Sequence, residues 1–415
     1  MAESRRTAAP SAAIAPSILR TMNQRYLLDW LYSNGPATRP QLARDSGLSQ
    51  PTVFATLANL EQAGLVRPSG QSDEPAGRPA LIYEADPTAG AVLAVDLGYD
   101  WVRIVVTDLL GRQLGKVEHR NTARSSKSLV DAVVEGASQV AKDAGLELSG
   151  MTTAVIASPG VYRAQAGRVA YAAQLPGWQR PRLAEELEKR LGLPITIENN
   201  INLAALSEYT EGAGQGVSPF AFLHIGTGVG LGMVIDGEVF RGATGAAGEV
   251  AFLPLLDVEG ATPEDRNRGI LEEALGADAL VSAAKDAGMT GTITPARVYK
   301  EARAGSALAL GVVRGQTELL ARLLVSLCSF LDPELVVLGG GVGQNLDLLG
   351  VGLMDRIGEL SPLRPRLAAS SLGSDAVVRG AVVHGISLAR EAEFQARMAS
   401  AITEAAPAAE RTGIS

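Results

Sequence analysis

Residues 222–232 read Phe-Leu-His-Ile-Gly-Thr-Gly-Val-Gly-Leu-Gly, an apolar strand that runs directly into four closely spaced glycines. The same order of strand and glycine turn occurs at residues 93–98 and 335–341. Glycine tolerates positive φ and close backbone approach, so main-chain N–H groups in such turns can surround a phosphate or another ligand. One such turn alone is equally well explained as an ordinary β-turn. Three of them predict two related halves around a cleft.

Strand-like and helix-like segments alternate around these turns. Amphipathic helical patterns cover residues 126–144 and 183–191, and an apolar strand lies between them at residues 153–157. This alternation is typical of α/β proteins. We therefore expect a first lobe over residues 87–219 and a second over residues 220–390, with the final helix able to return to the first lobe.

The N-terminal segment, residues 17–86, has the pattern of a winged helix-turn-helix. Thr38 and Gln41 form a capping-box pair, Gly47 allows a tight turn, and Ser49 is a good N-cap for a third helix. Apolar residues repeat in that third helix at Val53, Leu57 and Leu60. A helix, a short glycine turn and a second helix are typical of DNA-binding heads, and a β-wing is expected to follow.

Polar side chains on the third helix are candidates for contacts with base edges or phosphates in a major groove. The wing carries one arginine, of a kind that suits a narrow minor groove. The predicted DNA-binding residues are Arg39, Ser49, Gln50, Thr52, Thr56, Asn59 and Arg78. The alternative is an ordinary three-helix bundle with solvated polar residues.

Charge and composition narrow the class of protein. The chain has 415 residues and a net charge of −8, but residues 1–90 carry eight Arg, no Lys and eight acidic residues. Any DNA contact by this neutral head must therefore come from locally placed arginines. No apolar run reaches the roughly 18 residues of a membrane helix, and Cys328 is the single cysteine. We expect a cytoplasmic protein that does not contact membranes, with disordered ends at residues 1–16 and 403–415.

The chain resembles the ROK family, which joins bacterial sugar kinases to sugar-responsive repressors. The resemblance extends over residues 17–390. It is carried by Ser158-Pro159-Gly160, Leu175-Pro176-Gly177-Trp178, Glu198-Asn199 with Asn202, residues 226–232, residues 242–249, and Leu331-Asp332-Pro333-Glu334. The resemblance implies a winged helix-turn-helix followed by a two-lobed, actin-like ATPase fold, assembled as a homodimer or homotetramer.

Two departures from the family pattern argue against phosphoryl transfer. The family's kinases open with Asp-x-Gly-Gly-Thr, whereas Tyr99 and Asp100 follow Gly98 here, and they should repel a triphosphate. The family base is an aspartate in Glu-Asn-Asp-x-Asn, and this position is Asn200. An amide is a poor proton acceptor, and loss of a general base costs on the order of 10²–10⁴-fold in rate. We expect no catalytic residue, no bound ATP and no enzyme activity.

The family's zinc site is also absent from the sequence. Its histidine position is Phe252, and its cysteine positions are Pro263, Asp265 and Ile270. None of these supplies the thiolate or imidazole that structural zinc sites use. We expect no metal, and expect apolar packing around Phe252 and Ile270 to replace it.

In the family, sugar hydroxyls are held at positions that correspond here to Asn199, Asn200, Glu249, Phe252 and Glu272. The sequence therefore predicts a DNA-binding transcriptional regulator, in the first instance a repressor. Its partners would be operator DNA and a sugar or related metabolite that it senses without phosphorylating. The alternatives are a sugar kinase with a regulatory head, and a regulator with a vestigial pocket that a protein partner controls.

Overall fold

The computed structural model divides into two units. It describes residues 16–72, 79–163, 166–172, 175, 177–256 and 262–405, with side chains described to residue 400. The first unit, here called the head, contains residues 1–90, 108–112 and 389–415. The second unit, the body, contains residues 91–107 and 113–388. The end of the final helix thus belongs to the head, outside the segment 17–86 that the sequence suggests.

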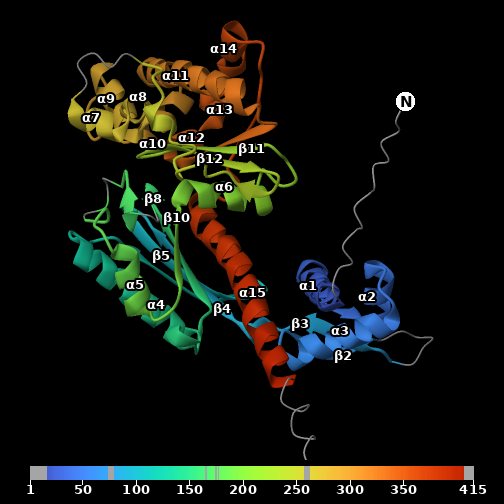
Figure 1. The fold of residues 1–415 in the computed structure, drawn as a ribbon. Helices are drawn as coiled ribbons and strands as arrows, with labels where there is room; N and C mark the ends of the chain where they lie inside the picture. Colours follow the sequence, from blue (N-terminus) through green and yellow to red (C-terminus); the bar gives the residue numbers. More distant parts are fainter. Residues whose placement is uncertain are drawn as a thin grey trace, which may run out of the picture. The chain divides into compact units, whose positions relative to one another are not determined.

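The head is a winged helix-turn-helix, which confirms the fold expected for this part of the chain (Figure 1). Its helices are α1 (Pro16–Asn34), α2 (Arg39–Ser46) and α3 (Gln50–Gln62). Its three strands pair antiparallel in the order β1 (Ala37–Thr38), β3 (Leu81–Ala85) and β2 (Val66–Gln71). The tip between β2 and β3, with the candidate Arg78, lies outside the described residues.

Capping residues set the limits of the second and third helices. The Thr38 hydroxyl accepts a hydrogen bond from the Gln41 amide at 3.4 Å, and the Ser49 hydroxyl accepts one from the Thr52 amide at 3.3 Å. Gly47 ends α2 at φ +70°, a left-handed conformation that favours glycine. The head core consists of Leu27, Leu28, Leu31, Leu42, Val53, Leu57 and Leu60, each at most 1% exposed.

The body is built around two five-stranded sheets, which confirms the two-lobed α/β fold (Figure 1). The first sheet has the order β10 (Ile195–Asn199), β7 (Thr153–Ser158), β4 (Ala91–Leu97), β5 (Trp101–Asp108) and β6 (Gln113–Arg120). The second has the order β13 (Glu238–Val239), β12 (Val229–Ile235), β11 (Phe220–Ile225), β14 (Leu335–Gly339) and β15 (Arg366–Ala369). The central strand of each sheet pairs in parallel with one neighbour: β4 pairs with β7 in the first sheet, and β11 pairs with β14 in the second.

Helices and short elements complete the body. The helices are α4 (Ser126–Asp143), α5 (Leu183–Leu191), α6 (Asn200–Thr210), α7 (Pro263–Arg268), α8 (Ile270–Leu275), α9 (Ala277–Asp286), α10 (Pro295–Arg303), α11 (Ala307–Leu331), α12 (Gly340–Gly343), α13 (Leu346–Leu349), α14 (Leu353–Leu360) and α15 (Ala376–Ala405). A small hairpin joins β8 (Val161–Arg163) to β9 (Arg168–Ala170), and 3-10 turns of the body lie at η2 (Leu148–Gly150), η4 (Val250–Phe252) and η5 (Gly373–Asp375). The 3-10 turn η1 (Pro87–Ala89) belongs to the head. Within the described residues, no helix combines the length and the apolar character needed to span a bilayer.

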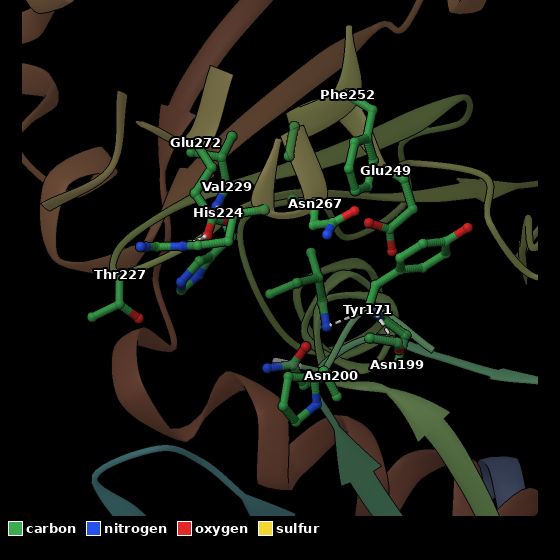
Figure 2. Close-up of a pocket in the computed structure, with 18 residues that line it drawn as sticks. Tyr171, Asn199, Asn200, His224, Thr227, Val229, Glu249, Phe252, Asn267 and Glu272 are labelled. Carbon is green, nitrogen blue, oxygen red and sulfur yellow. Dashed lines mark hydrogen bonds and ion pairs between the residues drawn. The ribbon is translucent and has the colours of Figure 1, made fainter. Parts of the chain in front are cut away.

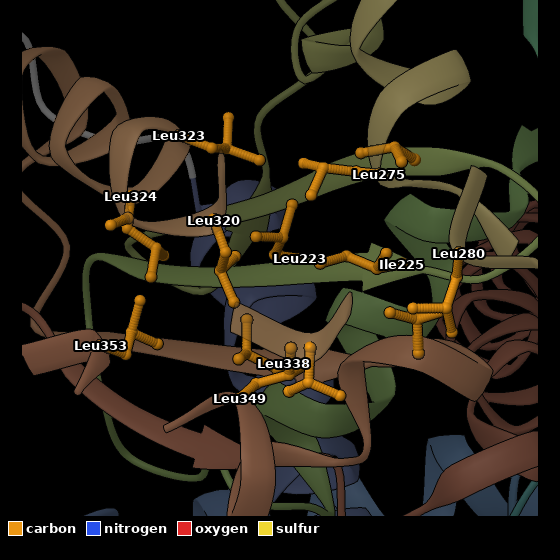
Figure 3. Close-up of a cluster of buried hydrophobic side chains, with 14 of the residues drawn as sticks. Leu223, Ile225, Leu275, Leu280, Leu320, Leu323, Leu324, Leu338, Leu349 and Leu353 are labelled. Carbon is orange, nitrogen blue, oxygen red and sulfur yellow. The ribbon is translucent and has the colours of Figure 1, made fainter. Parts of the chain in front are cut away.

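Each sheet has its own apolar core. In the second lobe, Leu223 of β11 and Leu338 of β14 belong to one buried cluster with Leu320 and Leu324 of α11 (Figure 3). In the first lobe, Ile156 of β7 belongs to a separate cluster that includes buried residues of α4. Burial of apolar surface contributes roughly 25 cal/mol per Å², so these two clusters are the main stabilising elements of the body.

Helix α6 packs against both lobes and against the start of α15. Its Leu203 is buried with residues of β4, β5 and β7, whereas its Ala205 is buried with Phe220 and Phe222 of β11. The Ser207 hydroxyl donates a hydrogen bond to the Ala376 carbonyl at 2.7 Å. At Gly380 the two helix backbones approach so closely that a Cβ would lie 1.8 Å from the Leu203 carbonyl oxygen.

This close approach makes Gly380→Ala a test of the helix pair. We expect the added methyl group to destabilise the body by about 1–3 kcal/mol, because the two backbones must separate. The matched control is Gly311→Ala in α11, where a Cβ would meet nothing within 4 Å. That change should stabilise the protein by about 0.5–1 kcal/mol, because alanine is the better helix former. Urea unfolding midpoints of both variants give the comparison, and equal stability of Gly380→Ala and wild type would contradict the packing described here.

Candidate functional site

A cavity of about 140 Å³ lies in the body, between residues of the two lobes. All five residues expected to bind a sugar line it: Asn199, Asn200, Glu249, Phe252 and Glu272. Figure 2 shows the two asparagines on one side of the cavity, with Glu249 and Phe252 opposite. The lining also includes residues that sequence reasoning did not single out: Tyr171, His224, Thr227, Asn267 and Arg268.

The two asparagines have different roles. Asn199 is the N-cap of α6: its Oδ1 accepts hydrogen bonds from the amides of Ile201 at 2.8 Å and Asn202 at 3.1 Å. Its Nδ2 donates to the Gly160 carbonyl at 3.0 Å, so most of its capacity is used within the protein. Asn200 makes no side-chain hydrogen bond to any described residue, which leaves its amide available to a ligand.

The cavity contains two carboxyl groups in a partly dehydrated setting. Burial raises the pKa of Glu249, and repulsion from Glu272 adds to the effect. Burial also raises the pKa of Glu272, although the Val229 amide donates a hydrogen bond to it at 3.2 Å and Arg268 opposes the shift. Burial lowers the pKa of His224 to about 4, so this imidazole is neutral at physiological pH. The carboxyl oxygens of Glu249 and Glu272 can accept hydrogen bonds from hydroxyl groups.

An aromatic pair forms another part of the lining. The rings of Tyr171 and Phe252 have centroids 5.5 Å apart and an interplanar angle of 57°, which is a favourable tilted arrangement. Arg163 donates a hydrogen bond to the Tyr171 hydroxyl at 3.2 Å. Tyr171 has φ +61°, which is unusual for a bulky residue. The two rings offer an apolar surface to one face of a ligand, next to the carboxyl groups.

The segment that would carry zinc ligands is organised by helix capping. Pro263 occupies the first turn of α7, and Asp265 forms a capping box with Thr262, with bonds of 2.8 and 3.1 Å. The expectation that Phe252 and Ile270 form a centre of apolar packing is wrong. The side chain of Phe252 is 41% exposed, and its ring contacts that of Tyr171. Among the described residues, no group of three potential metal ligands occurs.

The carboxylate of Asp96, at the first glycine turn, is paired with the guanidinium of Arg103. Asp96 is buried at the end of β4, and its Oδ2 accepts a hydrogen bond from Arg103 at 3.0 Å. Burial raises the pKa of Asp96 to about 6, against the attraction of Arg103. Arg103 also bonds to Glu118 at 3.0 Å. Tyr99 is 60% exposed on the adjoining turn.

In the head, the candidate DNA contacts on α3 divide into two groups. Ser49 and Gln50 are exposed at the start of the helix, and Thr52 and Asn59 are half-buried. The placement of Thr56 on the polar side is wrong, because its side chain is 4% exposed. Position 56 lies three residues after Val53 and therefore falls on the same helical face as the core residues.

Arg39 serves the packing of the head. Its guanidinium lies over the rings of Phe54 at 4.5 Å and Tyr83 at 4.9 Å, and it donates a hydrogen bond to the Tyr83 hydroxyl. Phe54, which is 54% exposed on α3, was not among the candidates. Gln50, Phe54 and Ala58 recur at i, i+4 and i+8 on the exposed side of α3. This spacing, which is complementary to that of the core, could have identified the outer face.

Comparison with known proteins agrees with this architecture. The ROK family profile matches residues 92–384, and the MarR family profile matches residues 20–78. The xylose repressor of Caldicellulosiruptor bescii is 25% identical over 393 residues, which cover 89% of this chain and 97% of that protein.

Two solved structures have a similar fold. A ROK family transcriptional regulator, a homolog of the E. coli MLC protein, superposes with a TM-score of 0.73 and 23% identity, covering 93% of this chain and 99% of that one. A ROK family glucokinase from Streptomyces griseus, in complex with glucose and AMPPNP, superposes with a TM-score of 0.60 and 25% identity, covering 71% and 99% of the two chains. The chain described here belongs to the ROK family, and its DNA-binding helix-turn-helix makes it a transcriptional regulator of that family.

Proposed function

We propose that this protein is a repressor that binds operator DNA through its head and senses an uncharged sugar in the body cavity without phosphorylating it. The observation that carries the proposal is that Asn200, an amide, lines the same cavity as Glu249, Glu272 and Phe252. The cavity thus has hydroxyl-binding groups, while the position of the family's general base holds a group that cannot take up a proton usefully. The similar C. bescii protein is a xylose repressor, and this likeness supports the assignment.

The phosphate side of the fold also disfavours catalysis. Arg103 forms ion pairs with both Asp96 and Glu118. The exposed side chain of Tyr99 lies on the turn that follows β4. A kinase would need another carboxylate to replace the aspartate absent at position 200. Glu249 is a candidate for this base, because burial, and then repulsion from Glu272, raise its pKa. Sugar-dependent ATP turnover in a coupled assay would favour the alternative function, a sugar kinase with a regulatory head.

The charges around the cavity favour an uncharged ligand. Glu249 and Glu272 contribute negative charge, and Arg268 already contacts Glu273 at 3.1 Å and Glu272 at 3.7 Å. A phosphorylated sugar would bring a dianion toward two carboxyl groups in a region of low dielectric, where repulsion is strong. A neutral sugar could direct its hydroxyls toward Asn200, Glu249 and Glu272 and an apolar face toward the aromatic pair.

A single titration tests the proposal. DNA selected from a random library by the full-length protein is titrated with the protein, alone and with D-xylose, D-glucose, N-acetylglucosamine and glucose 6-phosphate. Specific binding that a neutral sugar releases supports a sugar-responsive repressor. Specific binding that no compound alters, together with no thermal shift, favours a vestigial pocket controlled by a protein partner. Absence of any selected DNA would contradict the regulatory function.

Glu249→Gln separates stability from ligand response. Because the folded pKa of Glu249 is raised, the folded protein holds this proton more tightly than the unfolded chain, and stability falls as pH rises above the ordinary value of 4.5. Removal of the charge should therefore stabilise the protein at pH 7, and the gain should disappear as pH falls toward 4.5. The same variant should lose about tenfold or more in sugar affinity, because a charged acceptor is lost. Melting curves across pH and sugar titrations measure both effects; a destabilised variant at pH 7 would contradict the assigned burial.

Gln50→Ala tests the exposed face of α3. We expect it to weaken binding to the selected DNA by about 1–3 kcal/mol, because a side chain that can bond to a base edge is removed. Gln62→Ala, the same change at the exposed end of this helix, is the matched control and should leave affinity unchanged. Fluorescence anisotropy measures both. Equal affinities of the two variants would mean that Gln50 does not reach the bases.

A further inference from the structure

One continuous helix contributes to both units of the chain. Helix α15 runs from Ala376 to Ala405, and residues up to 388 belong to the body whereas those from 389 belong to the head. The two ends of α15 therefore have different surroundings, and each can be described within its own unit.

In the body, the start of α15 lies against α6, the helix whose first residues line the cavity. Gly380 meets the backbone of Leu203, and the Ala376 carbonyl accepts the bond from Ser207. Leu203 and Ser207 belong to α6, whose first turn carries the cavity residues Asn199 and Asn200. The position of α15 in the body is thus defined by direct contact with this helix.

In the head, the guanidinium of Arg397 on α15 bonds to the end of α3. Its Nη1 donates to the carbonyl oxygens of Ala63 and Gly64, each at 3.3 Å, and its Nη2 donates to the Ala89 carbonyl. Its Nε bonds to Glu393 at 2.8 Å, which fixes the side chain along α15. Ala63 is the C-cap of α3.

The chemistry of this contact suits a helix end. The last carbonyls of a helix lack partners within the helix and carry partial negative charge, so a cation placed there is stabilising. Gly64 has φ +66°, and a Cβ at this position would lie 2.9 Å from Arg397 Nη1. Glycine at position 64 therefore leaves room for the guanidinium.

Other contacts of α15 in the head involve α1. Arg25 forms an ion pair with Glu391 and lies over the Phe394 ring at 4.9 Å. Arg390 lies over the Tyr32 ring at 3.8 Å. These contacts hold α15 to the scaffold of the head, whereas Arg397 is bonded to the end of the helix that carries the outward face Gln50, Phe54 and Ala58.

We propose that Arg397 is a positioning residue for DNA recognition, which fixes the C-terminal end of α3 to α15, the helix that begins against α6 of the sugar cavity. The proposal rests on the proposed DNA-binding function. Arg397 acts through α3: it holds the recognition helix at one angle and depth, so that the residues of its outer face meet the bases together.

The experiment compares Arg397→Met, Arg397→Lys and the control Arg379→Met. Arg379 lies on α15 in the body and pairs with exposed Glu211 at 3.2 Å. Each full-length variant is titrated against the selected DNA and against random-sequence DNA. We expect Arg397→Met to weaken binding to selected DNA about tenfold or more and to leave binding to random DNA within about twofold. Arg397→Lys should restore part of the affinity, because one ammonium keeps the charge but cannot reach all three carbonyls. Arg379→Met should match wild type.

Amide hydrogen exchange of residues 60–65 provides a readout that does not depend on DNA. Arg397→Met should accelerate exchange there and leave α2 unchanged. If Arg397→Met equals Arg379→Met in affinity and in exchange, the inference is overturned and the proposed function stands. If binding to selected and random DNA is lost together with the helical circular dichroism of the head, Arg397 is only structural, which also overturns it. If wild type selects no DNA, the proposed function and this inference fail together.

Discussion

The hydrogen bonds of Asn199 at the start of α6 are the interaction on which the rest of the body depends. Its carboxamide caps α6 through two backbone amides and holds the Gly160 carbonyl of the loop after β7. Neighbouring Glu198 bonds to Asn202 at 3.0 Å and to Arg241 at 2.6 Å. Because α6 packs against both lobes and against α15, the direction set by this cap positions the cavity residues relative to each other.

The cavity shows the opposing demands of stability and binding. Burial raises the pKa of both Glu249 and Glu272, and repulsion from Glu272 adds to the shift at Glu249. A chain selected for stability alone would place neutral or apolar residues there. Such unfavourable burial is typical of sites that use charge for recognition. The two carboxyl groups in the cavity thus fit the proposed recognition of hydroxyl groups.

Glycine turns, caps and apolar spacing are local signals, and they predicted the fold. The cavity residues Asn199, Asn200, Glu249, Phe252 and Glu272 were expected from the resemblance to the ROK family. Residue polarity alone predicts an exposed Thr56 and a buried Phe54, whereas helical position gives the reverse, which is what the structure has. Sequence reasoning also missed Tyr171, which reaches Phe252 only through the tertiary fold. The contacts of Arg397 with the head were equally invisible, because the carbonyl groups of Ala63, Gly64 and Ala89 lie more than 300 residues away in sequence. Contacts between distant segments leave no short-range pattern.

The changes that remove family chemistry also supply local structure. At two former cysteine positions, proline and aspartate begin α7 through a first-turn residue and a capping box, and such caps contribute about 0.5–2 kcal/mol each. At the first glycine turn, Arg103 satisfies a buried carboxylate that would otherwise be costly. In both places the chain itself supplies the contact. Under the proposed function, the sugar would bind a cavity whose neighbouring segments already have these contacts within the chain.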